Sequence, residues 1–293
     1  MTETRSFEKA PATLPLMLKA ALPALPLVGS LPGVKHRSGS APDLVLERSG
    51  VAIETAHLDD YREVCGFPRT DALPATYPHM SAFALHMALM TDTAFPFAPM
   101  GLVHLRNSIT QLRPIGSDDV LDVSVRADGL RPHPKGRLID LLTDVAVDGD
   151  VVWREVTTLF SRGKGGAEEE APAPLDGVAA PSGVVHWKLD GALGRRYGAV
   201  SGDRNPIHLY PLTAKAFGFP TNIAHGMWTK ARCLATLQNK LPDAFTVDVE
   251  FKKPILLPST VVFGSEADGD TTTFGVVGSK KPSTHLVGRV TPL

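Results

Sequence analysis

The stretch SGDRNPIHLY, residues 201–210, contains an aspartate and a histidine, two residue types that commonly transfer protons in enzymes. Asp203 and His208 are five residues apart, so a continuous helix would place them about 140° apart around its axis. A strand would point them to opposite faces. Asn205-Pro206 favours a turn instead, because the residue before a proline avoids the helical region and asparagine readily starts a turn. A turn lets the carboxylate and the imidazole converge on one point.

The same residues also have a structural interpretation. In it, Asp203 forms an Asx-type turn and caps a following helix, while His208 simply packs within that turn. Residue types alone do not separate this interpretation from a proton-transfer site. The organisation of the whole chain favours the proton-transfer site.

The chain of 293 residues carries an internal repeat with a long period. Three pairs of stretches match in the same order: YREVCG (61–66) with YGAVSG (197–202), LPATYPHM (73–80) with FPTNIAHGM (219–227), and LRPIGSDDVLDVSV (112–125) with KKPILLPSTVVFGS (252–265). Tyr61 and His79 are 18 residues apart, whereas Tyr197 and His225 are 28 apart. The additional ten residues follow Gly202, so the segment from Asp203 to His208 exists in only one copy. A polar insertion in one copy favours a site over a shared structural turn.

Each half contains a helix followed by strands that position this loop. Helices are predicted at about 78–92 and 225–240, and Met227, Ala231, Leu234 and Leu237 form one apolar stripe on the second. Val, Thr and Phe enrichment between turn residues predicts strands. The predicted strands are 121–127, 137–147, 151–160, 246–251, 259–265, 272–278 and 285–291. One helix followed by an antiparallel meander suggests a curved sheet wrapped around its helix.

The two halves are separated by a segment rich in Gly, Ala, Pro and Glu, which we expect to be an exposed linker. The predicted organisation is therefore an N-terminal unit at 1–161, a linker at 162–184 and a C-terminal unit at 185–293. Two such units in tandem suggest an internal pseudo-dimer whose sheets join edge to edge.

Composition excludes several classes of protein. Thirty Lys and Arg residues against 31 Asp and Glu give a net charge of −1, which argues against a nucleic-acid partner. No run of 18 apolar residues occurs, so no membrane span is expected. Residues 11–33 are predicted to be a docked amphipathic segment rather than a cleaved secretory peptide. Cys65 and Cys233 are expected to be buried free thiols in a reducing, cytoplasmic setting.

YGAVSGDRNPIH (197–208), followed by FGFPTNIAHGM (217–227), resembles the MaoC-like, or hydratase 2, group of hot-dog-fold enoyl-thioester hydratases. The shared signature is an aromatic residue, then G-D-x-N-P-aliphatic-H, then an A/V-H-G-M helix start. The whole chain also resembles 3-hydroxyacyl-thioester dehydratases built from two hot-dog units, including the LPLMLKAALPALPLV, TYPHM and RPIG stretches. The resemblance implies an α+β double hot-dog fold with two tandem units, each a central helix wrapped by an antiparallel sheet.

The resemblance also implies a reaction, the reversible interconversion of (3R)-hydroxyacyl and trans-2-enoyl thioesters. The carrier would be coenzyme A or acyl carrier protein, and no cofactor or metal is required. Asp203 and His208 would be the catalytic pair, with Asn205 supporting their loop. Gly226, at a helix start, would offer its N–H to the thioester oxygen. The sequence leaves open which of Asp203 and His208 acts on water.

Several alternatives remain beside this interpretation. Asp203, His208 and His225 could hold a metal, although no fourth ligand or typical His spacing supports it. The chain could instead be a thioesterase on the same fold, or a non-catalytic acyl-binding or assembly subunit. His79, His86 and His104 are expected to be structural, and 83–101 is expected to be core rather than an acyl-chain tunnel. A further homodimer is plausible.

Overall fold

The computed structural model describes residues 2–21, 39–163, 165–166 and 175–293. The chain divides into two compact units that are interleaved along the sequence. The first comprises 1–52, 79–107 and 120–173, and the second comprises 53–78, 108–119 and 174–293. Parts of the predicted N-terminal segment (22–33) and of the predicted linker (164 and 167–174) lie outside the described residues. Within the described part of that linker, Leu175 is buried.

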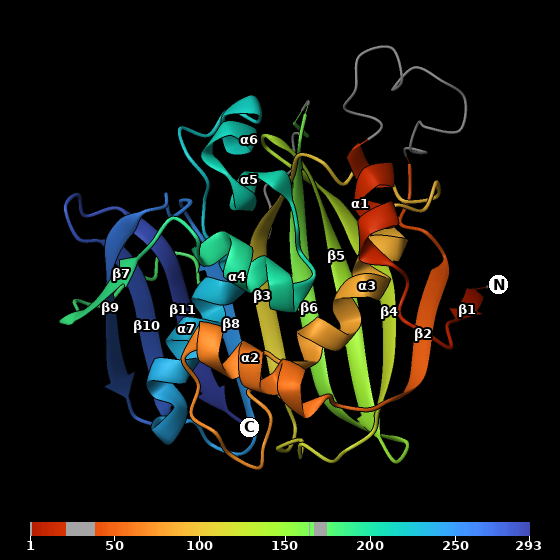
Figure 1. Ribbon diagram of the computed structural model, residues 1–293, viewed down its shortest axis with the longest axis horizontal. Helices are drawn as coiled ribbons and strands as arrows, with labels where there is room; N and C mark the ends of the chain where they lie inside the picture. Colours follow the sequence, from red (N-terminus) through yellow and green to blue (C-terminus); the bar gives the residue numbers. More distant parts are fainter. Residues whose placement is uncertain (1, 22–38, 164, 167–174) are drawn as a thin grey trace. The chain divides into compact units, whose positions relative to one another are not determined.

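The first unit is a largely antiparallel sheet with a helix across one face (Figure 1). Its strands, in spatial order, are β1 (Glu3–Ser6), β2 (Leu44–Val51), β4 (Leu121–His133), β5 (Gly136–Val147), β6 (Asp150–Arg162) and the first part of β3 (Leu102–Gln111). β1 pairs with β2 in parallel, and the pairs from β2 through β6 are antiparallel. Helix α3 (Pro78–Met90) crosses the face of β4, β5 and β6, and the unit also contains α1 (Thr13–Ala21).

The sequence of this unit explains its sheet. In β4, Val123, Val125 and Ala127 are buried while the residues between them are more exposed, so one face packs inward. Asp148 and Gly149 connect β5 to β6 and both have positive φ, 54° and 88°. An Asp-Gly pair suits the left-handed geometry of a tight hairpin turn.

The strands β7 to β11 of the second unit pair in antiparallel fashion. Their order is β8 (Phe245–Phe251), β11 (Thr284–Pro292), β10 (Thr271–Gly278), β9 (Ser259–Asp268) and β7 (Val185–Leu189). Its helices are α2 (Thr55–Cys65), α4 (Leu193–Ser201), α5 (Pro206–Leu209), α6 (Pro211–Ala216) and α7 (Gly226–Leu237), with a 3₁₀ turn η3 (Gln238–Lys240). The predicted apolar stripe of α7 is confirmed, since Met227, Ala231, Leu234 and Leu237 are all buried.

The two predicted helices and all seven predicted strands are present, as α3, α7 with η3, β4 to β6 and β8 to β11. The two Tyr-containing stretches of the repeat are helices, α2 and α4, which lie against each other with the rings of Tyr61 and Tyr197 6.4 Å apart. Both helices end at a glycine in the left-handed region, Gly66 at φ 79° and Gly202 at φ 74°. Glycine is favoured there because it has no Cβ to clash.

The structure also tests the expectations for the two cysteines and for a membrane span. Cys65 and Cys233 are free and buried, as predicted. Burial raises the pKa of both thiols, which keeps them protonated and unreactive. Among the described residues, no helix has both the length and the apolar character needed to cross a membrane.

Candidate functional site

The loop that follows α4 is held by its own short polar side chains. Gly202 ends the helix, and the Asp203 N–H donates to Ser201 Oγ at 3.2 Å. Asp203 Oδ1 accepts from the Asn205 N–H at 3.1 Å, which is an Asx turn. Asn205 Oδ1 then accepts from the Ile207 N–H at 3.3 Å and so caps α5. The structural interpretation is therefore right about the turn, but Asn205 is the cap rather than Asp203.

His208 lies at the inner side of this loop, with 8% of its surface exposed. Its Nδ1 is 2.8 Å from the Ile223 carbonyl, which only accepts, so Nδ1 carries the proton and donates it. Burial lowers the pKa of His208, and the nearby Asp203 carboxylate and the Ile223 bond only partly oppose this. The neutral ring therefore presents Nε2 as an unprotonated acceptor.

His225 and Gly226 form the start of α7 beside this histidine. The His225 ring is stacked on the His208 ring, with centroids 3.7 Å apart and planes 25° apart. Its Nε2–H donates to the Asp203 carbonyl at 3.0 Å, and the same nitrogen is 3.8 Å from Asp203 Oδ2. Gly226 is the first residue of the helix, where main-chain amides have no carbonyl one turn earlier. A Cβ at Gly226 would lie 3.0 Å from the Phe251 ring, so the chain packs closely here.

The loop thus brings Asp203 and His208 together, as predicted. One ligand-type atom from each of Asp203, His208 and His225 lies within 4.8 Å of the others. Each imidazole already donates one N–H to a main-chain carbonyl, so one nitrogen per ring remains as an acceptor. Two nitrogens and a carboxylate match zinc in type. The expectation that no metal binds stays a prediction, and metal analysis of the purified protein tests it.

Residues 181–286 match the profile of a family described as MaoC like domain, and this range includes the loop and the start of α7. Over 261 residues the chain is 41% identical to 3-hydroxyacyl-thioester dehydratase X of Mycobacterium tuberculosis, covering 88% of this chain and 91% of that protein. The chain belongs to the MaoC-like dehydratase family.

Solved structures agree with this MaoC-like assignment. The crystal structure of HtdX of M. tuberculosis matches with a TM-score of 0.75 at 38% identity, covering 85% of this chain and all of that one. A second M. tuberculosis protein, described as having a double hot-dog fold, matches with a TM-score of 0.52 at 14% identity over 88% of this chain and 96% of that one. This second likeness concerns the fold alone. The predicted α+β double hot-dog fold is confirmed.

Several residues that support this MaoC-like site were not predicted from the sequence. Asn222 Nδ2 donates to the main-chain oxygens of Gly191 and His208, at 3.1 and 3.3 Å, and ties the loop to the preceding turn. Ser201 is another supporting residue, because its hydroxyl accepts from the Asp203 N–H. His225 was considered only as a metal ligand. The FPTNIAHGM stretch that contains Asn222 and His225 was the available signal.

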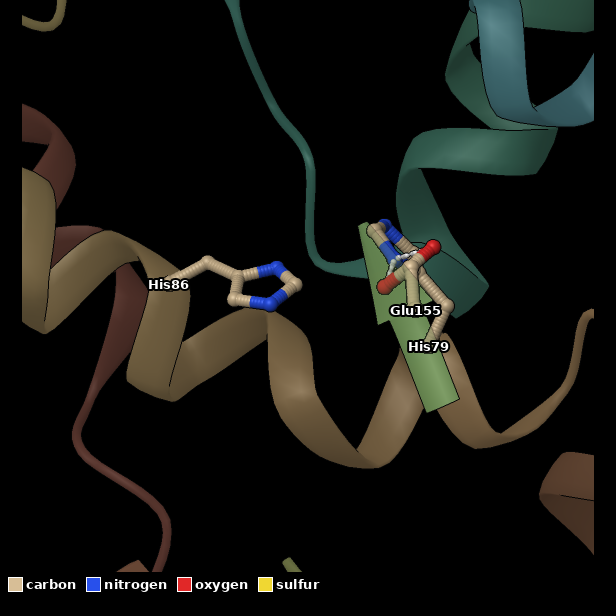
Figure 2. Close-up of side chains that lie close together, drawn as sticks. All are labelled: His79, His86 and Glu155. Carbon is tan, nitrogen blue, oxygen red and sulfur yellow. Dashed lines mark hydrogen bonds and ion pairs between the residues drawn. The ribbon is translucent and has the colours of Figure 1, made fainter. Parts of the chain in front are cut away.

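A second cluster of titratable side chains lies within the first unit, at His79, His86 and Glu155 (Figure 2). His79 Nδ1–H donates to both Glu155 oxygens, at 2.9 and 2.8 Å, and Asn107 Nδ2 donates to Oε1 at 2.7 Å. Burial alone would raise the pKa of Glu155, but the charge and hydrogen bond of His79 outweigh it and lower the pKa to about 2. His86 bonds Thr143 at 2.7 Å instead, and burial lowers its pKa to about 3. A buried carboxylate with its hydrogen bonds satisfied suits the structural role expected of His79 and His86.

Proposed function

We propose that this chain is a hydro-lyase that interconverts (3R)-hydroxyacyl thioesters and trans-2-enoyl thioesters. The observation that carries the proposal is the convergence of the Asp203 carboxylate and the His208 imidazole beside the start of α7. These residues lie inside the family-matched range, and the relative with 41% identity is named a 3-hydroxyacyl-thioester dehydratase. The geometry adds a bare imidazole nitrogen that can receive a proton.

In the hydration direction, His208 acts on water and Asp203 acts on carbon. Nε2 of His208 takes a proton from water while the water oxygen bonds to C3 of the enoyl chain. For this step the Asp203 carboxylate first takes up a proton from solvent and then gives it to C2, and the proton on His208 leaves to solvent, which restores the pair. A lowered pKa of His208 keeps this base neutral and ready at working pH. Dehydration runs the same steps in reverse.

Negative charge builds on the thioester oxygen when hydroxide adds at C3. The N–H of Gly226 is our candidate donor to that oxygen, because it is the first amide of α7 and helix N-termini favour anions. Close packing against Phe251 explains why glycine stands there, since any side chain would press on the ring. Asn205 has a supporting role, because its cap holds the turn between the two proton-transfer residues.

The wider organisation is also part of the proposal. We place one active site per chain in the unit at 185–293, and we assign acyl-chain binding to the unit at 1–161, with 162–184 as the linker. The substrate is an acyl thioester of coenzyme A or of acyl carrier protein. A cytoplasmic location and a homodimer complete the proposal, and the two buried free thiols support a reducing compartment.

The reaction is tested by adding crotonyl-CoA to the purified chain and following the loss of the ultraviolet absorbance of the conjugated enoyl group. Chain length is then varied, and the product is resolved by chiral chromatography. We expect hydration to a (3R)-hydroxyacyl product. Release of free thiol without hydration would indicate a thioesterase instead, and no hydration at any chain length with either carrier would overturn the proposal.

A further inference from the structure

We infer that His225 is a positioning residue that holds both members of the proposed catalytic pair, through its ring face and its N–H. This inference rests on the function proposed above. It assigns no proton transfer to His225 itself. It concerns where Asp203 and His208 lie and which way they point.

The contact with Asp203 is made to the main chain. A carbonyl oxygen only accepts, so the 3.0 Å contact requires the proton of His225 to be on Nε2. Asp203 directly follows Gly202, a residue in the left-handed region where the chain changes direction. Anchoring the Asp203 carbonyl therefore fixes the orientation of that residue, and with it the direction in which the carboxylate leaves the chain.

The contact with His208 is made face to face. The bond from Nδ1 to Ile223 holds one edge of the His208 ring, but rotation of an imidazole about its last side-chain torsion is soft. The stacked His225 ring, 3.7 Å away, blocks that rotation. Together the two restraints fix the direction in which Nε2 points. The ring of Tyr197 packs against the His225 ring, with centroids 4.9 Å apart, and supports it in turn.

The charge of His225 also suits this role. Burial, followed by the neighbouring His208, lowers the pKa of His225 to about 3, and the Asp203 contacts only partly oppose this. The ring is therefore neutral at working pH. A proton taken up by His208 meets no second positive charge on the ring stacked against it.

His225 also positions Gly226, the proposed donor to the thioester oxygen, through the backbone. Its carbonyl accepts from the N–H and from the hydroxyl of Thr229, both at 3.1 Å, which forms the first turn of α7. Gly226 is the next residue in the chain. The side-chain anchor on Asp203 thus sets the loop and the start of the helix relative to each other.

Two substitutions separate the contacts. His225→Phe keeps a stacking ring but loses the N–H, and His225→Gln keeps an N–H donor but loses the ring. We expect His225→Phe to lower kcat about 10- to 100-fold with KM within about threefold, because misplacement by about 1 Å costs about 100-fold in rate. His225→Gln should recover part of that loss by donating to the Asp203 carbonyl. Cys233→Ala, a buried change about two turns further along α7 and outside the proposed site, is the matched control and should stay within about twofold of wild type.

The pH profile separates a change in the position of His208 from a change in its surroundings. His225→Phe keeps the site dry, so the acid limb of kcat/KM should stay in place while kcat falls. His225→Ala admits water, so the pKa of His208 should rise towards its ordinary value and the acid limb should move to higher pH. Thermal unfolding of each variant shows whether the fold is intact.

The outcomes distinguish this inference from the proposed function. If wild type shows no hydration, the proposed function fails first. If wild type is active and His225→Phe matches it in kcat, the positioning role is wrong. The role is equally wrong if the loss in each variant merely follows the loss of folded protein, or if KM alone rises.

Discussion

Replacing His79 by phenylalanine removes the main partner of a carboxylate that is fully buried in the first unit. Glu155 has 1% of its surface exposed and His79 has 6%. In His79→Phe the carboxylate keeps only the Asn107 amide among the partners described above. A buried charge that loses its partner is strongly destabilising, whereas an apolar pair in the same place is often tolerated.

The expected loss can be worked out in two ways. The pKa of Glu155 falls from 4.5 to about 2, which corresponds to about 3 kcal/mol of stabilisation. Breaking one side of a buried ion pair costs about 3–5 kcal/mol in other proteins. We therefore expect His79→Phe to lower the free energy of unfolding by about 3–5 kcal/mol at pH 7.

The sign of the pH dependence follows from the direction of the pKa change. In the wild type the folded-state pKa of Glu155 is below its ordinary value of 4.5, so its stabilisation is complete above pH 4.5 and is lost as the pH falls towards 2. Without His79, burial raises the pKa of Glu155 instead. The variant then gains relative stability in mild acid, and its difference from wild type should shrink as the pH falls from 7 to 4.

Urea unfolding followed by circular dichroism and tryptophan fluorescence measures these differences. The double variant His79→Phe with Glu155→Leu removes both polar partners and should recover most of the stability lost in the single variant. A loss below about 1 kcal/mol for His79→Phe, or simple additivity of the two single changes, would show that His79 does not stabilise the buried Glu155 carboxylate.

Three further predictions concern the proposed site. Gly226→Ala should lower kcat about 10- to 100-fold because its Cβ presses on Phe251 and displaces the first amide of α7, and a kcat within twofold of wild type would contradict this. Asn205→Ala should cost about 1 kcal/mol in thermal unfolding and reduce kcat, whereas Asn205→Asp should retain the cap and its stability. The acid limb of kcat/KM should lie below pH 6.5, because burial lowers the pKa of His208 and the ring is neutral above that pKa. An acid limb above pH 6.5 would count against His208 as the base.

Helices and strands were predictable wherever the spacing of apolar residues in the sequence matches the residues that are buried. The strands of both halves alternate or cluster Val, Thr and Phe between turn residues, and the stripe on α7 repeats at helical spacing, so these elements were found. Helices α2 and α4 were not predicted, because they are stabilised by contact with each other across a long separation in sequence, from Cys65 to Leu193 at their nearest ends. Strand β3, whose sequence is LVHLRNSITQ, mixes charged and apolar residues and gives no clean period.

The proposed catalytic residues were predictable from the sequence, whereas the contacts that hold them in place were not. Asn205-Pro206 indicated the turn that lets Asp203 and His208 converge, and that convergence is present. The stacking of His225 on His208 was not predictable, because it depends on where the start of α7 meets the loop. Hydrogen bonds such as that from Asn222 to the His208 carbonyl likewise depend on tertiary position rather than on spacing.

The most direct measurement compares crotonyl-CoA hydration by wild type, Asp203→Asn and His208→Gln, with thermal unfolding of all three. Asp203→Asn nearly keeps the shape of its side chain, His208→Gln keeps a polar side chain without the ring, and both remove the ability to transfer a proton. The account predicts turnover by the wild type and a loss of at least about 100-fold in kcat for each variant, with folding preserved. Substantial hydration by folded Asp203→Asn or His208→Gln would contradict the assignment of this loop as the active site.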